Sequence, residues 1–254
     1  MDALHRSNLQ VPFKGRMIFR TKPKKPLIPN GMRVYAIGDV HGRADLLDGL
    51  FSRIDEHHAN NPVARSIEIF LGDYVDRGPS SRDVINRLLR RGSFRELIFL
   101  RGNHEVMFAE FLKDPSVLSR WQQVGGLETL MSYGLRGAIS QPDIMAEALD
   151  IALPEAHRNF LAGLRPSFVC GDFFFVHAGV RPGIPLANQS EEDLFWIRDE
   201  FLEHTGDFEK VIVHGHTPVR IPDFRRNRIN IDTGAYMTGR LTCVAFETDV
   251  VQTI

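Results

Sequence analysis

Apolar residues gather along the chain in short runs, and each early run ends in a polar loop that contains glycine. The runs predict three strands, each with the loop that follows it: 33–37 with Gly38-Asp39, 67–71 with Gly72-Asp73, and 97–100 with 101–105. Residues 43–58 and 84–89 lie between these strands and carry apolar side chains at helical spacing. Strand, loop and helix recur about every thirty residues, the length of a βαβ unit, so the pattern predicts parallel strands with helices packed on them.

The pattern changes in the rest of the chain. Residues 106–165 have mainly helical spacing, with breaks at Pro115, Gly134 and Pro142. After Pro166, short apolar or alternating runs predict strands at 167–170, 173–176, 211–213, 229–231 and 241–247. The second half is therefore expected to be rich in β-structure. Because no linker divides the chain after residue 30, we expect one domain over residues 31–254, with a helical insertion at about 106–165.

Composition narrows the class of protein. Of the 254 residues, 43% are hydrophobic and 25% charged, and the formal net charge of -1 provides no field that would attract nucleic acid or a membrane surface. No apolar run approaches a membrane span, and the N-terminus lacks the apolar core of a secretory signal. Cys170 and Cys243 lie too far apart for a CxxC motif. We expect a cytoplasmic protein without nucleic-acid or membrane partners, and the sequence carries no signal for an oligomeric state.

Residues 1–30 are the one strongly biased segment. They hold seven Lys and Arg but a single acidic residue, Asp2. Prolines 23, 26 and 29 favour an extended conformation over a helix. We interpret this segment as a solvated basic arm.

Side chains of the metal-binding kind follow the predicted strands. They are Asp39, His41, Asp73, Asn103, His104, His177, His214 and His216. Sites of open α/β sheets lie at the carboxyl ends of the strands, so these side chains are expected to meet there. Asp39 and His41 are expected on an extended segment, where residues i and i+2 point the same way and reach one ion. Asp73 could bridge two ions through its two oxygens, while Asn103 supplies a neutral oxygen.

Taken singly, each of these residues has an ordinary structural explanation. An Asp before a turn glycine is usually a turn residue or a helix cap, and a His at a strand end is usually part of a hydrogen-bonded framework. Jointly, so many ligand-type groups at the ends of apolar strands would be costly to bury without a metal. Mixed imidazole, carboxylate and amide ligands suit Mn, Fe, Zn or Co better than Mg or Ca.

Five sequence blocks, in this order, resemble those of the calcineurin-like metallophosphoesterases. They are GDVHG at 38–42, GDYVDRG at 72–78, GNHE at 102–105, VHAG at 176–179 and HGHTP at 214–218. Their form is that of the phosphoprotein phosphatase branch, and over residues 32–247 the chain is similar to bacterial and phage-lambda-type serine/threonine phosphatases. The resemblance implies a four-layer α/β/β/α sandwich, with two mixed sheets flanked by helices and metals at the strand ends.

The resemblance also implies two divalent metal ions, with Mn expected first and Fe, Zn or Co as alternatives. One ion is expected on Asp39, His41 and Asp73, and the other on Asp73, Asn103, His177 and His216. A hydroxide that bridges the ions is expected to attack phosphorus directly, because two ions polarise water and neutralise phosphate oxygens.

The same resemblance implies roles for residues beside the expected ligands. His104 is expected to be the general acid that protonates the leaving alkoxide, and Asp76 to orient its imidazole. Arg77, Arg198 and Asn103 are expected to hold the substrate phosphate, with Arg77 acting as a bidentate fork.

Four further residues are interpreted as structural. Glu105 is expected to brace its loop and His214 to support a ligand. Asp232 is interpreted as a turn carboxylate, and Trp121 as a core residue in preference to a wall of the substrate cleft.

Three functions are compatible with these motifs. The main hypothesis is hydrolysis of phosphomonoesters, above all phosphoserine and phosphothreonine in proteins. The alternative is a bis(5'-nucleosyl)-tetraphosphatase, which acts on small phosphoesters such as diadenosine tetraphosphate. Enzymes similar to the symmetrical type of the latter tend to lack Asp at position 76 and to carry Asp where Glu105 stands, so both residues favour the phosphatase. A binding module without chemistry should have eroded ligands, whereas every expected ligand is present here.

Overall fold

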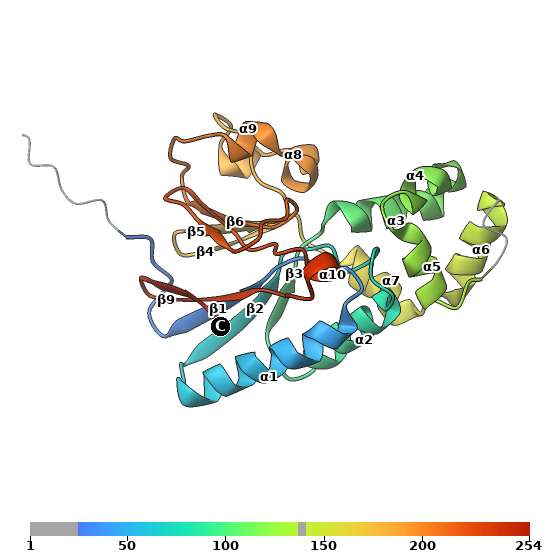
Figure 1. The fold of residues 1–254 in the computed structure, drawn as a ribbon. Helices are drawn as coiled ribbons and strands as arrows, with labels where there is room; N and C mark the ends of the chain where they lie inside the picture. The colour runs from blue at the N-terminus through green and yellow to red at the C-terminus, as the bar shows by residue number, and fades with distance from the viewer. Residues whose placement is uncertain (1–24, 137–140) are drawn as a thin grey trace, which may run out of the picture.

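Two five-stranded sheets stack against each other, and helices cover their outer faces (Figure 1). This computed structural model describes residues 25–136 and 141–254, so residues 1–24 of the expected basic arm lie outside the described part. The first sheet has the order β10-β9-β1-β2-β3, with β1 (Met32–Ile37), β2 (Arg65–Phe70), β3 (Leu97–Phe99), β9 (Cys243–Glu247) and β10 (Val250–Thr253). The second has the order β4-β5-β6-β8-β7, with β4 (Ser167–Cys170), β5 (Phe173–Val176), β6 (Val211–His214), β7 (Asp223–Phe224) and β8 (Arg228–Asn230).

Ten α-helices and two 3₁₀ turns connect the strands in the described residues. The helices are α1 (Ala44–Asn60), α2 (Ser81–Arg91), α3 (Asn103–Lys113), α4 (Leu118–Gln122), α5 (Gly126–Ser132), α6 (Pro142–Ala152), α7 (Glu155–Ala162), α8 (Glu191–Trp196), α9 (Asp199–Leu202) and α10 (Ala235–Thr238). The 3₁₀ turns are η1 (Pro115–Val117) and η2 (Leu186–Asn188). Helices α1 and α2 lie under the first sheet and α8 and α9 over the second, so the expected four-layer sandwich is confirmed (Figure 1).

Strand β1 explains how the layers are held together. It pairs with β2 in parallel and with β9 antiparallel, so both of its edges are hydrogen-bonded. Val34 and Ala36 belong to the apolar core between the sheets, whereas Tyr35 and Ile37 belong to the core between the first sheet and its helices. Both faces of the strand are therefore buried, which is why it reads as a continuous apolar run.

Aromatic side chains fill the space between the two sheets. The rings of Phe173 and Phe175 on β5 lie 4.9 Å and 5.7 Å from the ring of Phe246 on β9, measured between centroids. The contacts have edge-to-face geometry, the arrangement that aromatic pairs favour. This packing fixes the two sheets relative to each other and brings the ends of β1, β2, β5 and β6 to one edge.

Helices α3 to α7 project from one end of the sandwich, on the right in Figure 1. Helix α3 begins at Asn103, before residue 106 where helical spacing becomes visible in the sequence. The Glu105 carboxylate accepts a hydrogen bond from the backbone N–H of Gly102, a cap that starts the helix early. Trp121 on α4 packs against Phe108 and Phe111 on α3, with ring centroids 5.6 Å and 5.0 Å apart.

The second half of the chain is less purely β than expected. Helices α8 and α9 pack Leu194, Phe195 and Phe201 on the outer face of the second sheet, and α10 follows Gly234. Helices of four to six residues are too short to display a helical period in sequence. Strands β7 and β10, which were also not expected, lie at sheet edges and bury only one side or neither.

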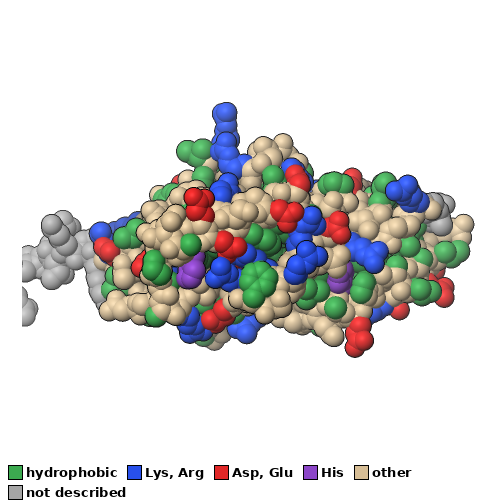
Figure 2. Space-filling model, turned by 90° about the horizontal axis from the view of Figure 1, so that it is seen from below, with side chains coloured by type: hydrophobic (Ala, Val, Ile, Leu, Met, Phe, Trp, Pro, Cys, Tyr) green, Lys and Arg blue, Asp and Glu red, His purple; other side chains and the backbone are tan. Residues whose placement is uncertain are grey.

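The described surface carries mixed charge. Figure 2 shows Lys and Arg side chains near the middle of one face, with Asp and Glu among them. Among residues 25–136 and 141–254, no helix combines the length and apolar character needed to cross a bilayer.

Candidate active site

The loops that follow four strands converge at one edge of the sandwich. Asp39 and His41 follow β1, Asp73 follows β2, His177 follows β5 and His216 follows β6. Asn103 joins them from the first position of α3, just after β3. All six side chains are buried, and short contacts link each of them to another member, so the structure brings together every residue that the sequence predicts as a metal ligand.

Asp73 lies at the centre of this group. Its Oδ2 atom is 3.3 Å from Nε2 of His41, and its Oδ1 atom is 3.4 Å from Nε2 of His177. Two sets of donor atoms lie within 4.8 Å of one another and could hold a metal ion: one from His41, Asp73 and His104, and one from Asp73, His177 and His216. Asp73 is shared by both sets, which is the arrangement that a carboxylate bridging two ions requires.

Two buried atoms at this edge lack a hydrogen-bond partner among the described residues. They are Oδ1 of Asp39 and Nε2 of His216. The other donor atom of each side chain is engaged, because Asp39 Oδ2 accepts from the His216 N–H at 3.0 Å and His216 Nδ1 lies 2.9 Å from Asn103 Oδ1. Buried polar atoms without a partner are costly, and a divalent cation would satisfy both. The donor set therefore fits a metal centre.

The protonation states of His41, His216 and Asp73 also fit cation binding, whereas burial raises the pKa of Asp39 in the absence of a cation. Burial lowers the pKa of His41 to about 3 and that of His216 to about 2, so both imidazoles are neutral at physiological pH. Burial acts to raise the pKa of Asp73, but the imidazoles of His177, His104 and His41 outweigh it and hold this pKa below its usual range. Neutral imidazoles and an ionised carboxylate are the forms that bind metals.

Glycines let the backbone pack directly against the ligand carboxylates. A Cβ atom at Gly102 would collide with the carboxylate of Asp73, and one at Gly215 would collide with that of Asp39. Since both neighbours are buried ligand-type groups with nowhere to move, only glycine fits at these two positions.

Left-handed backbone conformations concentrate in the site. Among the described residues, six non-glycine residues have positive φ, and five of them belong to the cluster or its immediate neighbours. They are His41 (44°), Asp73 (51°), Asp76 (70°), Arg77 (65°) and His216 (65°). Such conformations are sparsely populated and gather at functional sites, where the surrounding fold maintains them.

The expectation of an extended segment from Asp39 to His41 is wrong. With φ of 44°, His41 turns the chain, and its Nδ1 atom lies 3.0 Å from the carbonyl oxygen of Val75. The turn directs Nε2 of His41 toward Asp73 rather than along a strand face. Asp39 and His41 therefore reach the same cluster because the backbone turns between them, and not because they lie on the same face of an extended strand.

His104 forms a buried pair with Asp76. Its Nδ1 atom donates to Oδ2 of Asp76 at 2.7 Å, and Asp76 also accepts from Trp121 Nε1 at 2.8 Å and from Thr129 Oγ1 at 2.7 Å. Burial acts to lower the pKa of His104, but the carboxylates of Asp73 and Asp76 outweigh it and raise this pKa. The imidazole is thus held in one orientation, and its pKa lies above the usual value.

Trp121 and Thr129 were not predicted to support the site. Trp121 is a core residue, as its sequence context indicates, and it also donates to Asp76. Both residues come from helices α4 and α5, about 50 residues beyond Asp76 in the chain. No sequence signal links a tryptophan or threonine in a helical segment to a distant loop carboxylate, so only the structure reveals the contact.

Arg77 and Arg198, the predicted phosphate-binding residues, line one cavity with Asn103 and His104. Nη2 of Arg77 lies 3.1 Å from Nε2 of His104. Its guanidinium carbon lies 4.6 Å from the centre of the Tyr236 ring, within the range of a cation–π contact. Tyr236, on α10, is a further site residue that the sequence did not predict.

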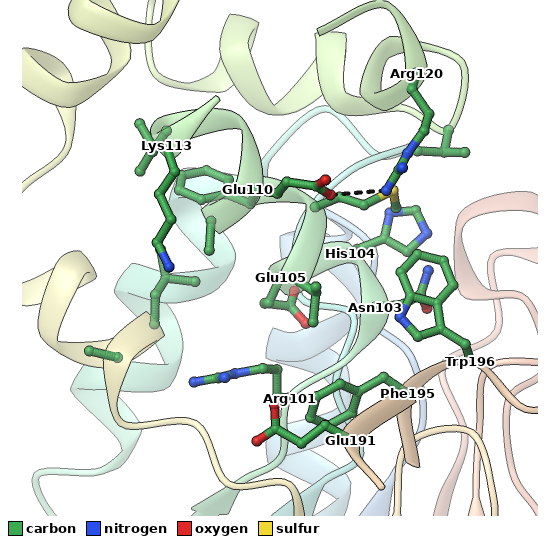
Figure 3. Close-up of a pocket in the computed structure, with 18 of the residues that line it drawn as sticks. Arg101, Asn103, His104, Glu105, Glu110, Lys113, Arg120, Glu191, Phe195 and Trp196 are labelled. Atoms are coloured by element: carbon green, nitrogen blue, oxygen red, sulfur yellow. Dashed lines mark hydrogen bonds and ion pairs between the residues drawn. The ribbon is translucent and has the colours of Figure 1, made fainter. Parts of the chain in front are cut away.

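The cavity has a volume of about 1190 Å³ and lies among α3, α7 and α8 (Figure 3). Its cationic lining residues are Arg77, Arg101, Lys113, Arg120, Arg158 and Arg198. Arg120 is paired with Glu110 at 2.9 Å and Arg158 with Asp150 at 2.7 Å. The other four cations have no carboxylate within 4.0 Å among the described residues.

Glu105 and Asp232 have the structural contacts expected of them, whereas the expected support of a ligand by His214 stays a prediction. The Glu105 carboxylate accepts from the backbone N–H groups of Asp73 and Tyr74, at 3.0 Å and 2.8 Å, and so braces the loop after β2. Asp232 accepts from the N–H of Gly234 at 2.8 Å, and burial raises its pKa to about 6. His214 lies outside both sets of metal donor atoms, and its Nδ1 donates to the Gly215 carbonyl at 3.1 Å.

Comparison with known proteins agrees with this geometry. The family model described as calcineurin-like phosphoesterase matches residues 32–251. The chain belongs to this family, and it is a phosphoric ester hydrolase. The asymmetrical bis(5'-nucleosyl)-tetraphosphatase PrpE of Halalkalibacterium halodurans is 26% identical over 237 residues, which cover 85% of this chain and 90% of that protein. PrpE of Anoxybacillus flavithermus is 27% identical over 225 residues, covering 83% and 89%.

Solved structures share the fold. A putative diadenosine tetraphosphatase superposes with a TM-score of 0.59 at 19% identity, covering 91% of this chain and 98% of that one. A cold-active protein-tyrosine phosphatase of a psychrophilic Shewanella species superposes with a TM-score of 0.55 at 18% identity, covering 89% and 83%. At such identities the likeness concerns the fold alone, and the names of the two proteins indicate different substrates.

Proposed function

We propose that this protein hydrolyses dinucleoside tetraphosphates, splitting each into a nucleoside triphosphate and a nucleoside monophosphate. The observation that carries the proposal is the cavity beside the Asp and His cluster, with four cations that have no carboxylate partner among the described residues. One phosphoryl group needs fewer positive charges than a chain of four phosphates. The curated relatives named asymmetrical bis(5'-nucleosyl)-tetraphosphatases, which align with 85% and 83% of the chain, support the same substrate.

The donor set would hold two divalent ions, with Mn expected first and Fe, Zn or Co as alternatives. His41 and Asp73 would hold one ion together with Asp39, whose Oδ1 has no partner among the described residues, while His104 of that donor set is engaged by Asp76. Asp73, Asn103, His177 and His216 would hold the other. Such ions supply activation of water and neutralisation of phosphate charge when bound.

The protein's own side chains position the phosphate and move the proton. Hydrolysis forms a bond from a water oxygen to phosphorus and breaks the bond to the bridging oxygen, which leaves with the electron pair. Arg77 and Arg198 would hold the non-bridging oxygens of the reacting phosphate. His104, kept in orientation by Asp76, would protonate the leaving oxygen.

Hydrolysis of phosphoserine or phosphothreonine in proteins is the second candidate. The 2.7 Å pair of Asp76 and His104 favours it, because a serine alkoxide leaves only with a proton, whereas a nucleoside phosphate is a better leaving group. From the sequence we rank this function first, on the grounds that Asp76 and Glu105 differ from the symmetrical tetraphosphatases. The relatives, however, are named asymmetrical tetraphosphatases, and the comparison of Asp76 and Glu105 concerned the symmetrical type only. Their names therefore lead us to rank the tetraphosphatase first and the protein phosphatase second.

Turnover on two substrates in parallel tests the proposal. The purified protein would be assayed with diadenosine tetraphosphate and with a phosphoserine/phosphothreonine peptide, each with added Mn²⁺ and with chelator. We expect a higher kcat/KM for the dinucleotide, with ATP and AMP as products and loss of activity on chelation. Preference for the peptide would establish the second candidate, and two molecules of ADP as products would exclude asymmetrical cleavage.

A further inference from the structure

We propose that the part of the cavity along α3, remote from the metal-type cluster, is a second phosphate subsite that holds the polyphosphate of the leaving group. We call it the distal subsite and define it by Arg101 and Lys113, with Leu112, Leu153 and Leu161 as its apolar wall. The inference rests on the proposed function, because it states which part of the substrate the cavity binds.

Helix α3 sets the distance between the two ends of the cavity. Asn103, in the metal-type cluster, is the first residue of α3 and Lys113 is the last. At roughly 1.5 Å per residue, the two positions lie about 15 Å apart along the helix axis. A single phosphoryl group occupies only the Asn103 end. A phosphate chain that carries a nucleoside is long enough to reach the other end as well.

Arg101 and Lys113 point into the same side of the cavity. Figure 3 shows both side chains on the side of the view opposite His104 and Asn103, with Lys113 running toward the side where the Arg101 guanidinium lies. The backbone N–H of Arg101 donates to the Arg165 carbonyl at 2.8 Å, which anchors the loop from which the side chain projects. The guanidinium and the ammonium have no carboxylate within 4.0 Å among the described residues. Glu191 lines the same cavity near Arg101 but forms no ion pair with it among the described residues, so the two cations remain open to an anionic ligand between them.

Apolar side chains complete the chemistry of the distal subsite. Leu112 lies on α3, Leu153 precedes α7 and Leu161 lies on α7, and all three line the cavity. Cations beside an apolar wall suit a ligand with both phosphates and a nucleobase. Inorganic phosphate lacks the apolar part, so the subsite matches a nucleoside polyphosphate better.

Asymmetrical cleavage decides which product the distal subsite holds. One product keeps a single phosphate and the other keeps three. Only the triphosphate extends from the reacting centre toward Lys113 at the far end of α3. When water attacks the phosphorus that stays in the nucleoside monophosphate, the triphosphate leaves with the bridging oxygen, and we assign this leaving group to Arg101 and Lys113.

Binding calorimetry on the Mn²⁺-loaded protein tests the distal subsite directly. The probes are inorganic tripolyphosphate and orthophosphate, titrated into the wild type and into the Arg101→Ala/Lys113→Ala double variant. The control is Arg120→Ala, which removes one cavity cation, as Lys113→Gln does, but one that is already paired with Glu110. Lys113→Gln is a second variant, since an exposed residue in the last turn of α3 can be changed without disturbing the core.

In the wild type we expect tripolyphosphate to bind more tightly than orthophosphate. The double variant should lose about tenfold or more in tripolyphosphate affinity, because two charge-assisted contacts are removed, and Lys113→Gln should lose part of it. Salt should weaken tripolyphosphate binding less in the double variant than in the wild type. Arg120→Ala should resemble the wild type.

The outcomes separate this inference from the proposed function. Unchanged tripolyphosphate affinity in the double variant, or an equal loss for orthophosphate, overturns the distal subsite even if diadenosine tetraphosphate is hydrolysed. Selective loss of tripolyphosphate affinity in a protein that does not hydrolyse the dinucleotide supports the subsite and refutes the substrate. Full kcat/KM for the dinucleotide in the double variant would also overturn the subsite.

Discussion

Oδ2 of Asp76 accepts a 2.7 Å hydrogen bond from Nδ1 of His104, in the interior of the protein. Asp76 lies in the loop after β2 and His104 in the first turn of α3, so the bond ties two neighbouring strand-end loops together. Trp121 and Thr129 donate to the same carboxylate from the projecting helices. The helical region thereby determines the orientation of an imidazole at the candidate active site.

Replacement of His104 by Asn should slow hydrolysis according to the leaving group. A general acid contributes roughly 10²- to 10⁴-fold, and a serine alkoxide needs the proton more than p-nitrophenolate does. We expect a loss in that range on a phosphoserine peptide and a smaller loss on p-nitrophenyl phosphate. Metal analysis is the control, because both ions should remain bound. Equal losses on the two substrates, or loss of metal, would contradict the role of His104.

Replacement of Asp73 by Asn should weaken both metal ions together. Asp73 is the one carboxylate shared by the two sets of donor atoms, and Asn offers a single neutral oxygen in its place. We expect metal content to fall for both ions, and the stabilisation of the wild type by Mn²⁺ to be lost. Ions at a hundred times their Kd would stabilise by about 2.7 kcal/mol per site. Retention of one full equivalent of metal would rule out a bridging role.

Arg77 allows a test of backbone strain at the site. Its φ of 65° costs a non-glycine residue roughly 1–2 kcal/mol of folding free energy. Replacement by glycine removes this cost, but the greater entropy of glycine in the unfolded chain offsets part of the gain. Arg77→Gly and Arg77→Ala should both lose phosphate binding, but the glycine variant should have the higher free energy of unfolding, by up to about 1 kcal/mol. Urea denaturation measures the difference.

Gln123 supplies the control for this comparison. Its φ of -62° and ψ of -19° lie in the right-handed helical region, which any residue adopts, so Gln123→Gly should be no more stable than Gln123→Ala. If glycine were also the less stable replacement at Arg77, the left-handed conformation would not be a source of strain.

A buried histidine outside the site should make stability pH-dependent. His157 lies between the Tyr133 hydroxyl, 2.8 Å from Nδ1, and Oδ1 of Asn86, 2.9 Å from Nε2. Burial lowers the pKa of His157 below the usual 6.5. At a pH just below 6.5 this histidine is therefore protonated in the unfolded chain but largely neutral in the folded protein. Its contribution to stability is therefore complete above pH 6.5 and declines as the pH falls toward the folded pKa.

The variant His157→Gln isolates this contribution, because glutamine can donate and accept in the same places without titrating. We expect the melting temperature of the wild type to fall more steeply between pH 7 and pH 5 than that of the variant. The other buried histidines and the carboxylates titrate in both proteins and cancel in the comparison. Parallel curves would show that His157 does not titrate differently on folding.

The members of the metal-type cluster could be predicted from the sequence because each lies at the end of an apolar strand. The carboxyl ends of parallel strands meet at one edge of a sheet, so Asp39, Asp73 and Asn103 had to be neighbours once β1, β2 and β3 were placed side by side. The turn at His41 was not readable, because a left-handed φ depends on the loop that packs against it.

The sequence by itself determined the strand–loop–helix order, the parallel strands of the first sheet and the set of polar residues at their ends, because hydrophobic periodicity and glycine-flanked loops are local properties. The tertiary structure decided what depends on distant segments. The contacts of Trp121 and Thr129 with Asp76, the stacking of Tyr236 on Arg77 and the cavity that Arg101 and Lys113 share all join elements far apart in the chain. Packing of the layers creates these relationships, and no local pattern encodes them.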